Sequence, residues 1–167
     1  MISKQSKKLA AAFSFSCLIL PFSVQASSEA AEIEVKAPFV REVPPIARAT
    51  AAFMTLKNHS DHDIYLTQAN SPAAKIVQLH THIHDHGVMR MRQIPNIKVP
   101  AHGETHLQPG GYHIMLIKPV KPIKQGENVK LTLTFKDGSH KTITAPVKSM
   151  MGGMMHHPHK YPPHMHP

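Results

Sequence analysis

Alternating apolar and polar residues occupy most of the chain after residue 32, and few segments have the three-to-four-residue spacing of an amphipathic helix. The clearest alternation is Lys130 to Phe135, where every second residue is apolar. An Asp137-Gly138 pair follows and predicts a tight turn into a second strand from His140 to Val147. This part of the sequence therefore predicts a β-hairpin.

Similar short runs precede this hairpin and are separated by turns rich in glycine, proline and asparagine. We predict strands over residues 33–40, 50–58, 63–68, 75–83, 88–93, 105–107 and 112–117. Seven to nine short strands at this spacing are typical of an all-β protein. The expected fold is a Greek-key β-sandwich or barrel.

The first 26 residues have a different composition. Lys4, Lys7 and Lys8 precede an apolar run over residues 9–24, and Val24-Gln25-Ala26 resembles a cleavage site. These features predict a signal peptide over residues 1–26, cleaved near Ala26, and export to the periplasm. We expect no membrane span after its removal. The mature chain would comprise a folded domain over residues 27–148 and a tail over residues 149–167.

Cys17 is the single cysteine, and it lies inside the predicted signal peptide. A mature chain without cysteine has no disulfide, no thiolate metal ligand and no redox pair. A blue-copper electron carrier, which needs a cysteine ligand, is thereby excluded.

The charge of the chain is basic, with a formal net charge of +9, and removal of three lysines with the signal peptide leaves +6. Such an excess either forms a solvated surface or attracts an acidic protein patch or anionic lipid. An exported chain with few aromatic residues is not expected to bind nucleic acid.

Residues 79–91 read LHTHIHDHGVMRM, in which histidine recurs at every second position. In a strand, residues two apart share a face, so His80, His82 and His84 would point the same way. Turn residues at the Asp-His-Gly segment then predict a hairpin.

The length of the hairpin loop decides which side chains face one another. A four-residue loop over residues 84–87 pairs His82 with Met89 and His80 with Met91, on one face. A three-residue loop instead sets His82 opposite Arg90 and separates the histidines from the methionines. The sequence leaves both possibilities open.

The second candidate strand, Tyr112-His113-Ile114-Met115-Leu116, has the same alternation. His113 and Met115 would share one face, while the other three residues would face the core. Thioether sulfur is a soft ligand and imidazole nitrogen a borderline one, so a mixed set of both favours Cu(I) over zinc and hard cations.

The C-terminal tail holds five of the ten methionines and five of the fifteen histidines, among glycines and prolines that disfavour a packed element. This low-complexity composition is typical of a metal-binding segment. The candidate ligands are Met150, Met151, Met154, Met155, His156, His157, His159, His164, Met165 and His166.

The spacing of the four candidate ligands in the two strands resembles a known motif. Ten residues separate His80 from Met91, twenty-one separate Met91 from His113, and one separates His113 from Met115. This H-x10-M-x21-H-x-M pattern, with the surrounding segments LH, GVM and PGGYHIML, resembles the periplasmic copper chaperones of the PCuAC family. The resemblance extends over approximately residues 33–147.

The resemblance implies a cupredoxin-like β-sandwich that binds Cu(I) through His80, Met91, His113 and Met115 and is not an enzyme. It implies delivery of copper to the Cu(A) centre of cytochrome c oxidase subunit II, or to a thioredoxin-like copper-assembly protein. It also implies a tail that binds a second copper, as Cu(II). The chain departs from the family pattern at three further histidines, and we treat these together with one methionine as auxiliary candidates: His82, His84, His86 and Met89.

A second interpretation of the same residues is sequestration. In that case the tail and the auxiliary histidines store copper, or copper and zinc, without a dedicated acceptor. We found no Ser-His-Asp or paired-carboxylate arrangement that would indicate catalysis. A monomer is expected, with a metal-bridged dimer as the alternative.

Overall fold

The computed structural model describes residues 27–149. This part of the chain forms a β-sandwich with ten strands and one short helix, α1 (Glu29–Glu32). The strands are β1 (Ile33–Arg41), β2 (Ala49–Asn58), β3 (Ile64–Asn70), β4 (Ala74–Asp85), β5 (Val88–Gln93), β6 (Ile97–Val99), β7 (Glu104–Leu107), β8 (His113–Pro119), β9 (Asn128–Phe135) and β10 (His140–Lys148). The predicted signal peptide, and the tail after Ser149, lie outside the described residues.

Most predicted strands are confirmed to within a few residues, and the differences are informative. β4 runs two residues further than predicted, to Asp85, because it stays paired with β5 up to the turn. The structure adds β6, which is only three residues long, and α1, which is only four. Elements this short carry too little periodicity to be recognised from the pattern alone.

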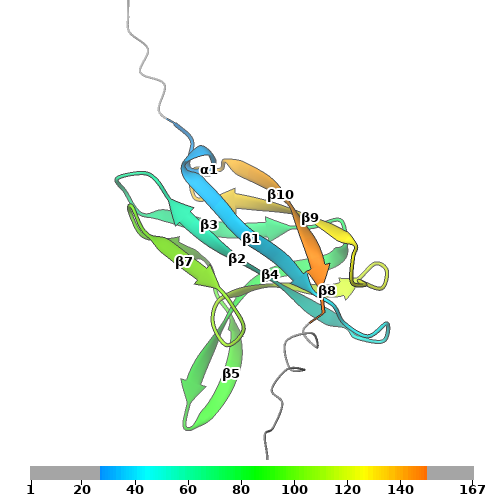
Figure 1. Ribbon diagram of the computed structural model, residues 1–167. Coiled ribbons are helices and arrows are strands. Elements are labelled where there is room, and N and C mark those ends of the chain that lie inside the picture. The colour runs from blue at the N-terminus through cyan, green and yellow to red at the C-terminus, as the bar shows by residue number, and fades with distance from the viewer. Residues whose placement is uncertain (1–26, 150–167) are drawn as a thin grey trace, which may run out of the picture.

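Hydrogen-bonded neighbours follow the order β5-β4-β8-β2-β1-β10-β9-β3-β6, and β7 pairs with β2 at the side of this path. The parallel pairing of β1 with β10 joins the two layers, while the other pairings are antiparallel. Figure 1 shows that the β4–β5 hairpin projects away from the body of the sandwich. The edge strand β5 is therefore the most outlying part of the sheet that carries the histidines.

The core lies between the layers and is formed by the inward residues of each strand. In β9 the expected alternation is confirmed, since Leu131, Leu133 and Phe135 are at most 1% exposed. The turn at Asp137-Gly138 is also confirmed, with Gly138 at φ 82° and β9 antiparallel to β10. Buried apolar side chains of this kind each stabilise a domain by about 1.5–3 kcal/mol.

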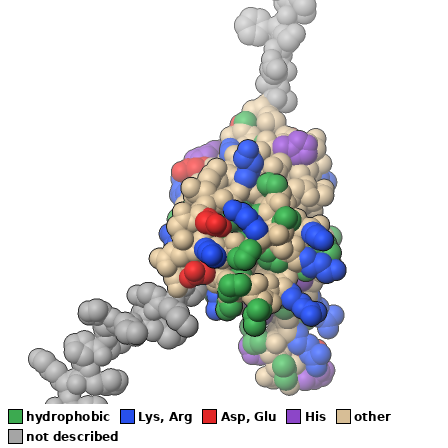
Figure 2. Space-filling view, turned by 90° about the vertical axis from the view of Figure 1, so that its right-hand side faces the viewer, with side chains coloured by type: hydrophobic (Ala, Val, Ile, Leu, Met, Phe, Trp, Pro, Cys, Tyr) green, Lys and Arg blue, Asp and Glu red, His purple; other side chains and the backbone are tan. Residues whose placement is uncertain are grey.

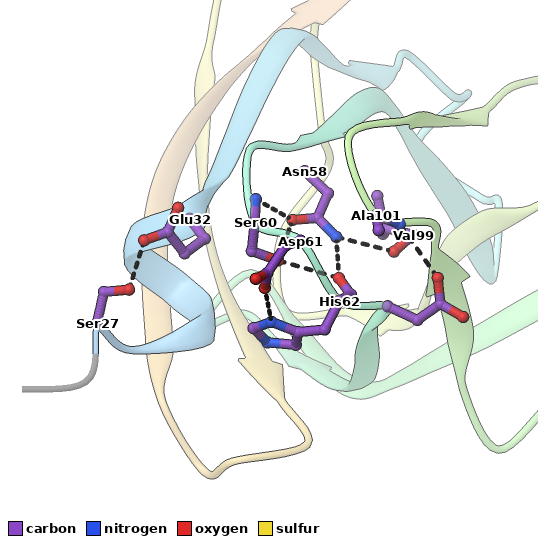
Figure 3. Close-up of polar contacts among 9 residues, drawn as sticks. Ser27, Glu32, Asn58, Ser60, Asp61, His62, Val99 and Ala101 are labelled. Carbon is purple, nitrogen blue, oxygen red and sulfur yellow. Dashed lines mark hydrogen bonds and ion pairs between the residues drawn. The ribbon is translucent and has the colours of Figure 1, made fainter.

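At the opposite end from the β4–β5 hairpin, Asn58 organises the loop between β2 and β3 (Figure 3). Its side-chain nitrogen donates to the carbonyl oxygens of His62 at 2.7 Å and Val99 at 3.2 Å, and its oxygen accepts from the backbone N–H of Ser60 at 2.9 Å. Asn58 is 1% exposed. One buried amide thus satisfies polar groups of the β2–β3 loop and of β6.

Candidate metal centre

The β4–β5 hairpin is closed by a two-residue turn, because Asp85 pairs with Val88. His86 and Gly87, the turn residues, have φ values of 49° and 81°. Two consecutive left-handed residues are typical of the type I′ turn, which matches the twist of a hairpin. The predicted four-residue loop over residues 84–87 is therefore wrong. It would have ended the pairing at residue 83, whereas β4 stays paired with β5 up to Asp85.

This shorter turn changes the partners but preserves the face. His82 lies opposite Met91, and His84 lies opposite Met89. The predicted pairs His82–Met89 and His80–Met91 are wrong, and His80 faces Gln93 instead. Because the two registers differ by an even number of residues, histidines and methionines still share one face. The three-residue alternative, with His82 opposite Arg90, is excluded.

Strand β8 brings the second pair of candidate ligands to the same face. His80 of β4 lies directly opposite His113, and Gln78 lies opposite Met115. His80 is thus flanked by β5 on one side and β8 on the other. Two segments more than twenty residues apart in the sequence meet here through antiparallel pairing.

Three imidazole rings cluster at this meeting point. The ring centroid of His113 lies 5.8 Å from that of His80 and 5.2 Å from that of His82. His80 Nδ1, His82 Nδ1 and His113 Nε2 are buried nitrogens that have no hydrogen-bond partner in the part of the chain that the structure describes. A buried polar atom without a partner costs about 1–3 kcal/mol, so such a concentration indicates that a ligand supplies the missing partner.

Hydrogen bonds on the opposite side of two of these rings define their protonation. His113 Nδ1 lies 3.0 Å from the carbonyl oxygen of Gly111, which only accepts, so Nδ1 carries the proton. His80 Nε2 lies 3.0 Å from Gln78 Oε1 and donates to it. In each ring the unpartnered nitrogen then presents a lone pair, which is the form that binds a metal.

Burial also favours the neutral rings. It lowers the pKa of His113, a residue that is 2% exposed, although the hydrogen bond to Gly111 opposes this effect and the nearby His82 adds to it. Burial likewise lowers the pKa of His80, with smaller contributions from His113 and His82. Both imidazoles are thereby kept available to a metal over a wider pH range.

The thioethers lie beside this cluster. Met91 and Met115 line a cavity of about 410 Å³ together with His82, His113 and Phe53. Met91 is 46% exposed, and Met115 is partly buried. The cavity therefore has imidazole and thioether donors in its wall and an approach from solvent.

One expectation about β8 is wrong. Ile114 and Leu116 are fully buried, as predicted, but Tyr112 is 40% exposed and does not belong to the core. Tyr112 precedes β8, in the turn where its carbonyl accepts from Gln108. His113, on the predicted ligand face, is itself buried, and the rings of Phe53, His80 and His82 surround it at centroid distances of 6.4, 5.8 and 5.2 Å.

Only one of the auxiliary candidates, His82, belongs to the imidazole cluster. His84 and Met89 form the next cross-strand pair on the same face, two residues closer to the tip of the hairpin, and both are exposed. His86, in the turn, has its Nε2 3.6 Å from Asp85 Oδ1, and its side chain is 99% exposed. Among residues 27–149, no three His, Cys, Asp or Glu side chains are placed to hold one metal ion. A metal centre in this part of the chain would accordingly need methionine as a ligand.

Sequence reasoning missed two groups that orient the rings, the Gln78 side chain and the Gly111 carbonyl. Gln78 was detectable in principle, because it stands two residues before His80 and so shares its face. The role of Gly111 depends on how the backbone turns into β8, which residue types alone do not reveal.

Comparison with known proteins assigns the chain to a family. A family model described as "Putative lipoprotein LpqE-like" matches residues 33–147. The chain belongs to the LpqE-like family. A relative from Leifsonia xyli, "Putative lipoprotein Lxx21020", is 33% identical over 135 residues, which cover 80% of either chain. An uncharacterised protein of Rickettsia prowazekii, RP573, is 25% identical over 59% of this chain and 55% of that protein.

Solved structures confirm the fold of this LpqE-like chain. The solution structure of apo-DR1885 from Deinococcus radiodurans is 35% identical, covers 89% of this chain and 99% of its own, and superimposes with a TM-score of 0.58. Its Cu(I) form is 38% identical over 72% of this chain and 81% of its own, with a TM-score of 0.59. The copper-bound PCuAC domain of PmoF2, 22% identical, shares the fold with a TM-score of 0.60 and covers 75% of this chain and 99% of its own. The predicted cupredoxin-like β-sandwich and the resemblance to the PCuAC family are confirmed, and the sandwich is open rather than a closed barrel.

The described part of this LpqE-like chain contains no helix of the length and apolarity that a membrane crossing requires.

Proposed function

We propose that this protein is a periplasmic copper chaperone that binds Cu(I) in the cavity between β4, β5 and β8. The observation that carries the proposal is the set of three buried imidazole nitrogens, on His80, His82 and His113, that have no hydrogen-bond partner within residues 27–149. Met91 and Met115 line the cavity together with two of these three histidines, His82 and His113. Soft thioethers combined with imidazoles form a donor set that Cu(I) prefers over zinc and hard cations.

His80, Met91, His113 and Met115 are the proposed primary ligands. They follow the motif of the PCuAC proteins, and a relative 38% identical to this chain has been solved in its Cu(I) form. The observed pairing of β4 with β5 bears on this assignment, because His82, and not His80, lies opposite Met91. His82 is accordingly proposed as a ligand that can take the place of His80, since no three imidazoles within residues 27–149 are placed to hold one ion.

Such a site suits a carrier that must release its copper. Neutral thioether and imidazole ligands exchange without losing a proton, and they are not oxidised to disulfides in an exported protein. The exposure of Met91 gives an acceptor access to the metal. The proposed acceptor is the Cu(A) centre of cytochrome c oxidase subunit II, or a thioredoxin-like copper-assembly protein.

The remaining parts of the proposal concern the ends of the chain. Residues 1–26 would direct export and be cleaved near Ala26, and the Met/His-rich tail after Ser149 would bind Cu(II). The tail raises the local concentration of ligands and so recaptures an ion that leaves the domain.

Replacement of both proposed thioether ligands tests the Cu(I) site. We expect Met91→Leu with Met115→Leu to weaken Cu(I) binding at least 100-fold in competition with a chromogenic chelator, while Cu(II) uptake by the tail persists. Met54→Leu is the matched control, because Met54 is buried in the core of β2, 3% exposed. Retention of full Cu(I) affinity in the double variant would contradict the proposal.

Sequestration remains the second candidate function, favoured by the exposed His84 and His86 outside the cavity. A chain ending at Ser149 distinguishes the two. A chaperone should still transfer one copper to an acceptor protein without its tail, whereas complete loss of transfer would make the tail the functional part.

A further inference from the structure

The donor residues of β4 and β5 continue beyond the cavity towards the tip of the hairpin. On one face, His80 is followed by the His82–Met91 pair and then by the His84–Met89 pair. Residues two apart in a strand are separated by about 6.5–7 Å. Imidazole and thioether groups thus form a row that leads from the buried rings to solvent.

The opposite face of the hairpin differs in chemistry. Asp85 Oδ2 accepts from Arg90 Nε at 3.1 Å and lies 3.8 Å from Arg92 Nη2. These ion pairs hold the charged groups of the hairpin on the face that carries no methionine. Neutral donors are thereby segregated on one face and formal charges on the other.

Met89 is 47% exposed, which is unusual for a thioether that serves only to fill space. Its cross-strand neighbour His84 is also exposed. Directly opposed residues of an antiparallel pair have Cβ atoms about 4.5–5.5 Å apart, within reach of one bound ion. Figure 2 shows histidine, basic and hydrophobic side chains together at the lower end of the molecule, where Figure 1 places this hairpin.

We propose that His84 and Met89 form a second, transient Cu(I) site through which copper enters and leaves the cavity. This inference rests on the proposed function and adds a route to it. The ion would move from His84 and Met89 to His82 and Met91, and then to the buried rings.

Each step of this route is a ligand exchange without change of oxidation state. A nitrogen or sulfur lone pair of the next donor pair binds the ion as one donor of the previous pair leaves, so the number of bonds to the ion is conserved. His82 can bind the ion at two successive sites of the route. It lies opposite Met91, and its ring is 5.2 Å from that of His113. The absence of a single three-residue His, Cys, Asp or Glu site within residues 27–149 fits a succession of small sites.

The test uses the full mature chain labelled with ¹³C at the methionine methyl groups and titrated with Ag(I) as a redox-inert substitute for Cu(I). We expect the Met91 and Met115 signals to shift with the first equivalent and the Met89 signal to shift with a later one. His84→Ala should abolish the Met89 shift and leave the first two unchanged. Val88→Ala is the matched control, because Val88 is an exposed side chain on the other face of the same hairpin.

A kinetic measurement complements the titration. With one equivalent of Cu(I) bound, His84→Ala with Met89→Leu should slow transfer to a chelator at least five-fold, while Val88→Ala leaves the rate unchanged. A Met89 shift that persists in His84→Ala, or an unchanged transfer rate, would overturn the inference. Failure of the proposed function has a different signature, the absence of any Met91 or Met115 shift.

Discussion

His82 and Met91 are direct cross-strand partners, and the ring of His82 lies 5.2 Å from that of the buried His113. His82 therefore connects the exposed thioether to the buried imidazoles. We expect His82→Ala to weaken Cu(I) binding about 10-fold, within the range measured for residues that support metal ligands. Competition with a Cu(I) chelator measures the effect.

His84→Ala provides the comparison for this prediction, because His84 is two residues away on the same face but exposed. Its first Cu(I) equivalent should bind as in the unaltered protein. Equal losses of affinity in the two variants would show that His82 has no special place in the centre.

The sequence predicts which residues share a face better than it predicts which residues meet. Alternation along residues 79–91 and 112–116 is sufficient to place histidines and methionines on one side of a sheet, and the structure confirms this. The exact partners depend on the turn at His86 and Gly87, where a histidine adopts a left-handed conformation. Residue type gives weak information there, because only a few per cent of non-glycine residues do so.

Burial of the site was also beyond the sequence. His113 is buried among the rings of Phe53, His80 and His82, which come from β2 and β4, two strands that pair with β8 over long distances in the sequence. Local patterns do not encode such long-range pairings. The predicted ligand set itself came from motif spacing, and the structure adds Gln78 and Gly111 as the groups that orient two of the rings.

The lowered pKa values of His80 and His113 predict how stability depends on pH in the metal-free protein. In the unfolded chain both rings titrate near 6.5, whereas in the folded chain they resist protonation. The unfolded state therefore binds more protons below that pH, and stability is lost as pH falls through the lowered folded values. Urea unfolding at pH 7.5 and pH 5 should show this loss.

Lys98 lowers the pKa of the Asp63 carboxyl, so this folded-state group titrates below the range of the two histidines. His80→Gln should reduce the loss between pH 7.5 and pH 5. If its pH dependence equals that of the unaltered protein, His80 is not a source of the effect.

The turn at the tip of the hairpin predicts an effect on stability that depends on residue type. His86 has a φ of 49°, a conformation that asparagine tolerates much better than alanine. We expect His86→Asn to stabilise the protein by about 0.5 kcal/mol and His86→Ala to destabilise it by about 0.5–1 kcal/mol. Chemical denaturation of the metal-free forms measures both free energies of unfolding. Equal stabilities of the two variants would contradict the left-handed conformation of residue 86.

Asn58 is predicted to be the most sensitive polar residue at the other end of the sandwich. Its amide serves His62, Val99 and Ser60 in a buried position, so Asn58→Ala leaves several polar groups without partners. Each such group costs about 1–3 kcal/mol, and we expect a total loss of about 3 kcal/mol in the free energy of unfolding.

Asn96→Ala is the control, since Asn96 is exposed, and it should change stability by less than about 0.5 kcal/mol. Because this loop lies outside the metal cavity, the folded fraction of Asn58→Ala should still bind its first Cu(I) with unchanged affinity, and a parallel loss of affinity would show that the two ends of the sandwich are coupled.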